Sequence, residues 1–132
     1  VTFEEQPGQT PFISLPGGQS YSGEDLKLCA QRELLEETGY TSDDFQEWFR
    51  HDIFGWQKLD WDIQYFIASN CSKTKSQILD SGEKILVKEL AFEEFIEVAQ
   101  KDEFNVGVIK NRLKEIAHNK EDLEKFKKEI FG

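Results

Sequence analysis

Basic residues, cysteines and long apolar runs are all scarce in this sequence. Only 16 Lys and Arg residues oppose 26 Asp and Glu residues, which gives a formal net charge of -10 over 132 residues. Because proteins bind nucleic-acid backbones and anionic lipids mainly through Lys and Arg, this balance argues against nucleic-acid and membrane partners. The same acidity is typical of an ordinary soluble surface. It is also compatible with a phosphorylated small-molecule ligand when divalent cations bridge carboxylates to phosphates.

The few cysteines and the missing apolar runs exclude further classes of protein. Cys29 and Cys71 form no CxxC pair and have no histidine at ligand spacing, which argues against a zinc site. No basic start precedes a short apolar segment, and no run of about 20 apolar residues is present, so we expect neither secretion nor membrane insertion. By default, we expect a cytoplasmic protein.

Apolar residues are nevertheless sufficient for a core. Hydrophobic residues make up 38% of the chain and include 11 Phe and 3 Trp, so the chain should be globular. A length of 132 residues suits one domain over 1–132, and we find no internal repeat or low-complexity linker.

Hydrophobic periodicity predicts strands, a helix, more strands, and then helices. The predicted strands lie in these ranges: 1–3, 12–15, 48–56, 62–68 and 85–90. The first two ranges are either two strands or one interrupted strand. Helical spacing continues from Phe92 to the C-terminus. This order predicts an α+β or a layered α/β domain.

The first predicted helix covers residues 24–38. Ser22 or Gly23 can cap its start, and Gly39 stops it. The apolar residues at helical spacing, which we expect to form its buried stripe, are Leu26, Cys29, Ala30 and Leu34.

Three glutamates of this helix point to metal chemistry. Glu33, Glu36 and Glu37 are spaced i, i+3, i+4 and therefore project from one helical face. Carboxylates crowded in this way repel one another unless cations lie between them, and hard oxygen ligands favour Mg²⁺ or Mn²⁺. Arg32 lies four residues before Glu36, within reach of an ion pair that would orient a carboxylate. A solvated glutamate-rich face is the alternative interpretation.

The residues around these glutamates form a recognisable motif. Gly18, then Glu24, then the run Arg32-Glu33-Leu34-Leu35-Glu36-Glu37-Thr38-Gly39-Tyr40 match the pattern G-x5-E-x7-R-E-U-x-E-E-x-G-U, in which U is a bulky apolar residue. Seven fixed identities in register should arise by chance on the order of once in ten million chains of this size. On this motif the chain resembles the Nudix hydrolase family.

The resemblance implies a fold, a cofactor and a site. The fold would be a layered α/β/α sandwich with a mixed sheet. Mg²⁺, with Mn²⁺ as a possible substitute, would be bound by the carbonyl of Gly18 and by the carboxylates of Glu33, Glu36 and Glu37. Arg32, Glu36 and Glu37 would be catalytic, and a water would attack one phosphorus without a covalent intermediate. Glu24 is expected to brace the loop or cap the helix and not to bind metal.

The general base of the family varies between a box glutamate and a carboxylate on a later loop. Glu83 is our candidate outside the box, because it lies in an acidic turn before the predicted strand 85–90. The alternative is an ordinary exposed loop glutamate.

The segments 82–87 and 92–96 are similar to the closing strand and helix of the ADP-ribose and nucleotide-sugar pyrophosphatase branch. The proline that often follows the box in ADP-ribose enzymes is missing, and Gly55 and Trp56 stand near its place. Trp56 and Phe54, with Trp61 as a further candidate, could stack on a nucleobase, and packing in the core is the alternative.

Only 17 residues precede Gly18, whereas members of this family usually have two or more strands before the motif. We therefore expect the N-terminal strands to be missing or truncated, or to be supplied by the partner in a homodimer.

The leading functional hypothesis is hydrolysis of ADP-ribose or a nucleotide sugar to a nucleoside monophosphate and a sugar phosphate. One alternative is hydrolysis of nucleoside triphosphates or dinucleoside polyphosphates at the same metal site. A second is a non-catalytic, nucleotide-binding regulatory module.

His51 and His118 have no visible partner in the sequence and are assigned no role.

Overall fold

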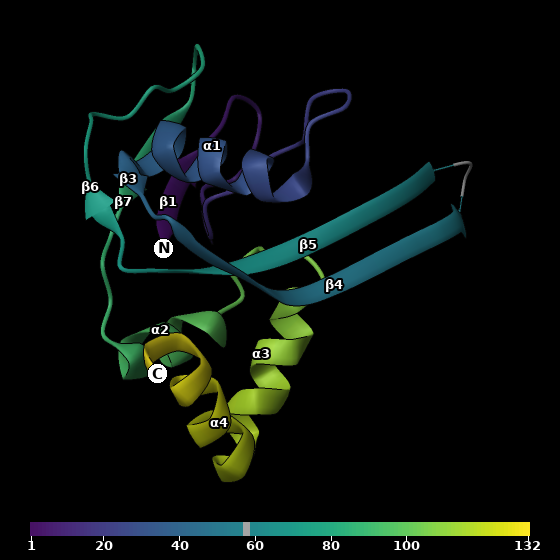
Figure 1. Ribbon diagram of the computed structural model, residues 1–132, viewed down its shortest axis with the longest axis vertical. Coiled ribbons are helices and arrows are strands. Elements are labelled where there is room, and N and C mark those ends of the chain that lie inside the picture. The colour runs from purple at the N-terminus through teal and green to yellow at the C-terminus, as the bar shows by residue number, and fades with distance from the viewer. Residues whose placement is uncertain (57–58) are drawn as a thin grey trace.

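The fold has three layers. The computed structural model describes the backbone of residues 1–56 and 59–132 and the side chains of residues 1–51 and 62–132. Its elements are β1 (Thr2–Glu5), β2 (Phe12–Ser14), α1 (Leu26–Thr38), β3 (Tyr40–Thr41), β4 (Asp44–Trp56), β5 (Leu59–Ser69), β6 (Ser72–Lys73), β7 (Lys84–Val87), α2 (Phe92–Ala99), α3 (Ile109–His118) and α4 (Lys120–Phe131). Figure 1 shows α1 above the long β4–β5 hairpin and the helices α2, α3 and α4 below it. The predicted α+β class and layered order are confirmed.

The strands pair as three small antiparallel sheets in the part of the chain that is described. Their orders are β2-β1-β7, β3-β6 and β4-β5, where we expected one mixed sheet. A parallel contact joins β2 to the α2–α3 connection, where Ile13 N–H donates to Glu103 O and Asn105 N–H donates to Ile13 O, each at 2.8 Å. β7 ends at Val87, before the predicted Leu90, although the backbone of Lys88 still exchanges two hydrogen bonds with Val1, each at 3.0 Å.

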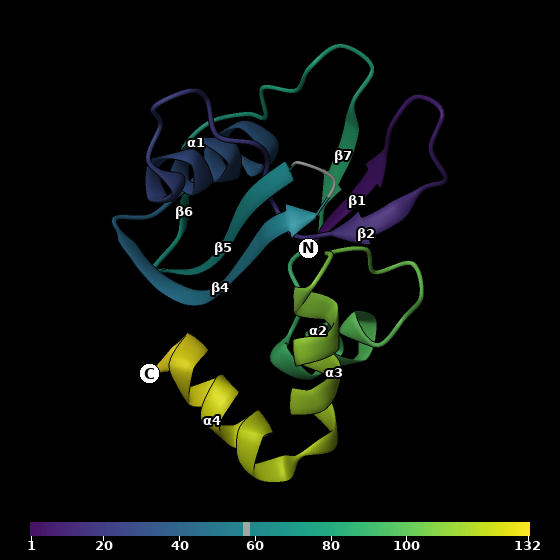
Figure 2. The same ribbon diagram turned by 90° about the vertical axis from the view of Figure 1, so that its right-hand side faces the viewer.

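The central strand β1 has two distinct faces. Phe3 packs against the core of the helical layer. Thr2 and Glu4 are buried and alternate with Phe3, so they point to the opposite face, where Glu4 lies across from Ile85 of β7. In Figure 2, β1 lies between β2 and β7, and α1 lies to one side of this sheet. Glu4 is therefore a buried carboxylate on the side of the sheet toward α1.

The β4–β5 hairpin separates α1 from the helical layer. Its backbone register runs from Asp44 opposite Ser69 to Trp56 opposite Leu59, with irregularities between Glu47 and Phe49 and between Ile53 and Trp56. Trp48 packs on Phe126 of α4, with ring centroids 4.8 Å apart. The hairpin is thus anchored to α4 on the side away from α1.

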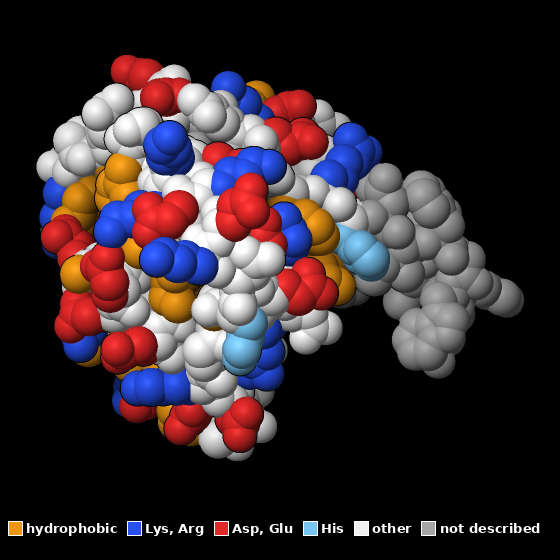
Figure 3. All heavy atoms as spheres, turned by 90° about the horizontal axis from the view of Figure 1, so that it is seen from below, with side chains coloured by type: hydrophobic (Ala, Val, Ile, Leu, Met, Phe, Trp, Pro, Cys, Tyr) orange, Lys and Arg blue, Asp and Glu red, His pale blue; other side chains and the backbone are white. Residues whose placement is uncertain are grey.

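The predicted C-terminal helical run divides into α2, α3 and α4, and most of the core lies here. The buried hydrophobic residues of this layer are Phe92, Ala99, Phe104, Ile109, Leu113, Ile116 and Phe126. Asn119 caps α4 by accepting from the backbone N–H groups of Glu121 and Asp122. The face in Figure 3 carries Lys and Arg interspersed with Asp and Glu, without a continuous basic stripe among its described residues.

Within the described residues, no helix is both long enough and apolar enough to cross a membrane.

Candidate functional site on the first helix

The helix that carries the motif begins two residues later than predicted. Asp25 is the N-cap residue, and its Oδ1 accepts from the N–H of Lys27 at 2.9 Å and of Leu28 at 3.3 Å. The prediction of a Ser22 or Gly23 cap was wrong, because the Asp25 carboxylate satisfies the free N–H groups of the first turn. The helix ends at Thr38, as predicted. Gly39 follows it in the left-handed conformation, with φ 78°, which is common for a glycine at the end of a helix.

The predicted buried stripe of α1 is only partly buried. Cys29 is buried, whereas Leu26, Ala30 and Leu34 are half-buried and line a cavity toward the hairpin. The prediction was wrong for these three residues because the β4–β5 hairpin does not close onto them.

The loop at residues 16–18 lies directly on the glutamates of α1. Gly17 N–H donates to Glu37 Oε2 at 2.9 Å. A Cβ built on Gly18 would lie 2.2 Å from Glu33 Oε1, so only glycine leaves room for that carboxylate. The loop and the last two turns of α1 therefore form one unit in which backbone and carboxylates are in contact.

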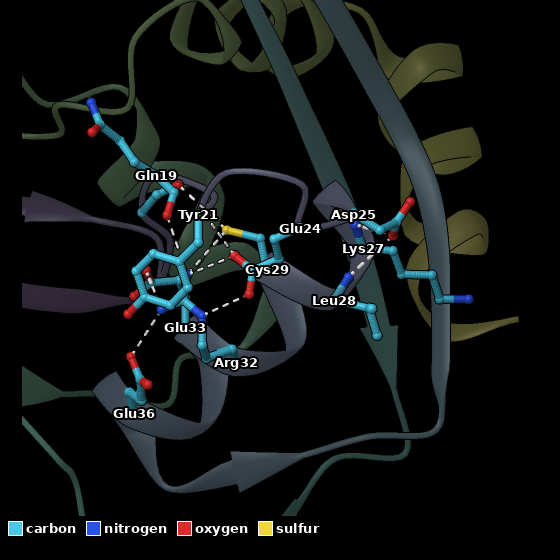
Figure 4. A network of polar contacts seen from close by, with 11 residues as sticks. Gln19, Tyr21, Glu24, Asp25, Lys27, Leu28, Cys29, Arg32, Glu33 and Glu36 are labelled. Carbon is cyan, nitrogen blue, oxygen red and sulfur yellow. Dashed lines mark hydrogen bonds and ion pairs between the residues drawn. The ribbon is translucent and has the colours of Figure 1, made fainter.

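Arg32 joins the remaining carboxylates of the motif, as Figure 4 shows. Its Nε and Nη2 each lie 3.0 Å from an oxygen of Glu24, a bidentate geometry. Its Nη1 donates to Glu33 Oε1 at 2.9 Å and to Glu36 Oε2 at 3.1 Å. The second contact is the Arg32–Glu36 ion pair that the spacing predicts. The ring of Tyr21 lies 4.0 Å from the guanidinium carbon. Arg32 thus links the start of α1 to two of the three clustered glutamates.

Glu24 braces the loop, as predicted. It accepts from the N–H of Tyr21 at 3.1 Å in addition to its two bonds with Arg32. The hydrogen bonds from Arg32, followed by that from Tyr21, lower the pKa of Glu24 to about 2. The carboxylate stays ionised and committed to these partners.

Glu37 is in the opposite electrostatic situation. Burial raises its pKa to about 8, and the nearby carboxylates of Glu4, Glu33 and Glu83 add to the increase, although the Gly17 N–H opposes it. Burial also raises the pKa of Glu33, against the influence of Arg32. The end of α1 is therefore a place where several carboxylates crowd together and disfavour the charged form of Glu37.

Glu83 lies near the glutamates of α1. The side chain is half-buried, and its Oε2 accepts from the N–H of Asp80 at 3.0 Å. Its charge contributes to the raised pKa of both Glu33 and Glu37. The turn before β7 thus brings a carboxylate from a distant part of the sequence to the motif.

Glu4 is a further carboxylate that the sequence analysis missed. It is 7% exposed, and it accepts from Thr2 Oγ1 at 2.7 Å and from Gln6 Nε2 at 3.3 Å. Its charge adds to the raised pKa of Glu37. The signal in the sequence was the alternation of Thr2, Phe3 and Glu4 in a strand, which places Glu4 on the face opposite Phe3.

The predicted base-stacking residues are placed only by their backbone. Phe54 and Trp56 lie in β4, and Trp61 lies in β5 opposite Ile53. Their side chains lie outside the described residues, so their stacking role stays a prediction.

Of the two histidines, His118 contacts Lys114 O through Nδ1 at 2.6 Å, and His51 is half-buried in β4.

The donors of the site suit a hard divalent cation. Carboxylate oxygens and a backbone carbonyl are the ligands that Mg²⁺ and Mn²⁺ prefer, and the missing side chain of Gly18 lets the Glu33 carboxylate approach the loop backbone. Among the residues with described side chains, no three acidic, Cys or His groups already converge on one point. The reason is visible in the contacts, since Arg32 holds Glu33 and Glu36 while Gly17 holds Glu37. Metal binding would require these carboxylates to move toward one point, while Arg32 can still hold one oxygen each of Glu33 and Glu36.

A glycine loop packed on clustered helical carboxylates is a class of site suited to metal-bridged phosphates. A family model described as NUDIX domain matches residues 3–111, which is more than half of the chain, and the protein belongs to this family. Membership implies hydrolysis of pyrophosphate bonds in nucleoside diphosphate derivatives, for which these proteins generally use divalent metal ions. A comparison with curated proteins finds no match.

Proposed function

We propose that this protein hydrolyses the pyrophosphate bond of ADP-ribose or a nucleotide sugar and releases a nucleoside monophosphate and a sugar phosphate. The observation that carries the proposal is the contact of the loop at residues 16–18 with the carboxylates of Glu33 and Glu37, inside the segment that matches the family. The likeness of segments 82–87 and 92–96 to the ADP-ribose and nucleotide-sugar branch supports this choice of substrate.

We propose Glu33, Glu36, Glu37 and the carbonyl of Gly18 as the ligands of Mg²⁺, with Mn²⁺ as a substitute. When bound, the metal supplies positive charge to the pyrophosphate oxygens and to the attacking water. The raised pKa of Glu37 supports this assignment, because a buried carboxylate among other carboxylates gains most from a neighbouring cation.

In the reaction, a water oxygen forms a bond to one phosphorus as the bond from that phosphorus to the bridging oxygen breaks. The water proton passes to a carboxylate, and the other phosphate leaves with the bridging oxygen. Glu83 and Glu37 are the proposed bases, since both carboxylates lie at the end of α1 and neither is committed to Arg32. Arg32 positions Glu33 and Glu36 by holding both from one nitrogen.

The substrate would be a small molecule, with Trp56 and Phe54 as proposed substrate-binding residues. We also propose that the protein forms a homodimer. Analytical ultracentrifugation would test this. A monomer at micromolar concentration would contradict it.

The test of function is product release from a panel of ADP-ribose, nucleotide sugars, nucleoside triphosphates and dinucleoside polyphosphates, with Mg²⁺ or Mn²⁺. Glu37→Gln should lower kcat by at least about a hundredfold, the scale of one electrostatic or acid–base contribution. Glu97→Gln is the matched control, because Glu97 is an exposed glutamate of α2.

Each outcome of the panel supports a different one of the three functional hypotheses. Turnover of ADP-ribose or a nucleotide sugar that depends on Glu37 supports the proposal. Preference for triphosphates or dinucleoside polyphosphates would move the protein to another substrate class of the same chemistry. Binding without turnover of any compound would indicate the regulatory module instead.

A further inference from the structure

The half-buried apolar face of α1 borders a cavity of about 720 Å³ between this helix and the β4–β5 hairpin. Leu26, Ala30 and Leu34 line it from the helix, and Phe45 and Phe66 line it from the hairpin. This contrasts with α3, where Ile109, Leu113 and Ile116 are at most 2% exposed. The volume falls in the range of about 300–1,000 Å³ that is usual for small-molecule sites. The apolar face of α1 is thus left uncovered by the described part of the protein.

The cavity shares a wall with the proposed metal site. Gly17 and Gly18 line it at one end, and the same two residues contact Glu37 and Glu33. A ligand in the cavity would therefore lie beside the place where a pyrophosphate would be held. This continuity connects the cavity to the reaction.

We propose that this cavity binds the nucleobase of the nucleoside diphosphate substrate, an inference that rests on the proposed function. Phe45 and Phe66 meet edge to face, with ring centroids 6.4 Å apart, and give the hairpin wall an aromatic surface. Leu26, Ala30 and Leu34 supply an apolar wall opposite. Such walls suit a flat heteroaromatic ring, whereas the hydroxyl groups of a sugar would lack hydrogen-bond partners along them.

Gln64 supplies a polar group at the same wall. It lies two residues before Phe66 on β5, so both side chains point to one face of the hairpin, and both line the cavity. A side-chain amide offers a donor pair and an acceptor, the combination that reads the edge of a base. Tyr65 also lines the cavity, but its hydroxyl is already engaged because it donates to Val106 O at 2.7 Å. Gln64 is therefore the residue we assign to base recognition.

The first test measures nucleoside binding without metal or phosphate. Adenosine, guanosine, uridine and ribose 5-phosphate are titrated into the full chain while amide NMR shifts are followed. We expect at least one nucleoside to bind with millimolar or better affinity and to shift amides of Leu26–Leu34 and of Phe66. Ribose 5-phosphate should leave these amides unchanged. Shifts caused equally by ribose 5-phosphate, or no binding of any nucleoside, would overturn the proposal.

The second test fills the cavity. Ala30→Trp should weaken nucleoside binding at least tenfold, whereas Leu28→Trp should not, because Leu28 is on the same helix but 58% exposed. Gln64→Leu keeps the volume and should change the ranking of the bases while raising KM more than it lowers kcat. If Ala30→Trp does not fold, Gln64→Leu decides the question, and an unchanged ranking and KM would overturn the proposal.

These results separate the cavity from the proposed function. Nucleoside binding that Ala30→Trp abolishes, in a protein that hydrolyses nothing in the panel, would uphold the cavity and reject the hydrolase. Hydrolysis with an unchanged KM in a folded Ala30→Trp variant would reject the cavity and uphold the hydrolase.

Discussion

At the scale of single residues, the site depends on contacts too short to accept an added atom. Gly17 and Gly18 are neighbours in one loop, yet a Cβ on Gly17 would meet no atom within 4 Å, and one on Gly18 would lie 2.2 Å from Glu33 Oε1. An alanine at Gly17 therefore tests the effect of a methyl group on the loop alone. An alanine at Gly18 tests its effect on the loop and on the Glu33 carboxylate together.

We expect Gly18→Ala to lower kcat/KM at least tenfold with little loss of stability, because the flexible Glu33 side chain can move away but then leaves its place in the site. Gly17→Ala should stay within about twofold of the parent. Steady-state kinetics and urea denaturation of both variants check this. Equal activity losses in the two variants would show that loop conformation, and not Glu33, is responsible.

The pKa of Glu37 predicts a pH dependence of stability. Because the pKa is raised from 4.5 to about 8, the folded chain holds this proton more tightly than the unfolded chain does. The resulting stabilisation is fully present below about pH 4.5 and is lost as the pH rises through 8. Urea denaturation of metal-free protein between these values should show the loss, and Glu37→Gln should remove it. A slope that persists in Glu37→Gln would assign it to other groups.

At the scale of elements, the helix that carries the motif was readily predicted, whereas its surroundings were not. The spacing of Glu33, Glu36 and Glu37 and the stop at Gly39 are local properties, so the sequence contains them directly. The pairs β3–β6 and β1–β7 join residues far apart in the chain, and two-residue strands leave no alternation to detect.

The end of α1 gives a prediction of its own. Gly39 and Gly23 both have φ 78°, but a Cβ on Gly39 would lie 2.0 Å from the backbone oxygen of Lys75, whereas one on Gly23 would meet nothing within 4 Å. Gly23→Ala should cost about 1–2 kcal/mol of unfolding free energy from the left-handed backbone alone. Gly39→Ala should cost more, because backbone atoms must also move. Urea unfolding measures both, and equal losses would rule out the contact with Lys75.

At the scale of the whole molecule, the order of the predicted strands and helices indicated the α+β class, while only the fold shows how the site is assembled. The sequence separates Glu4, Glu83 and the α1 glutamates, and the β1–β7 pairing brings them to one end of α1. Glu4 was missed because a carboxylate in a strand is not evidently buried until the opposite face is known to pack on the helical layer. Burial that depends on contacts with distant parts of the chain cannot be predicted from hydrophobic periodicity.

The excess of negative charge predicts that metal binding stabilises the entire fold. Mg²⁺ at about 100 times its Kd should raise the unfolding free energy by about 2.7 kcal/mol, because only the folded chain assembles the site. NaCl at equal ionic strength is the control, since a net charge of -10 is itself screened by salt. Differential scanning calorimetry would show the increase. Glu33→Gln should reduce the stabilisation by Mg²⁺. If NaCl stabilised the protein as much as Mg²⁺ does, the result would contradict a specific metal site.

The backbone link between Ile13 and the residues on either side of Phe104 joins the glycine loop to the helical layer. Only Ser14, Leu15 and Pro16 separate Ile13 from Gly17, so the loop has little freedom to detach by itself. Loop and helices should consequently open as one cooperative unit, with amide protons of Ile13 and Asn105 exchanging at the rate of the helical core. Activity would then persist in denaturant until the helices melt and disappear with them.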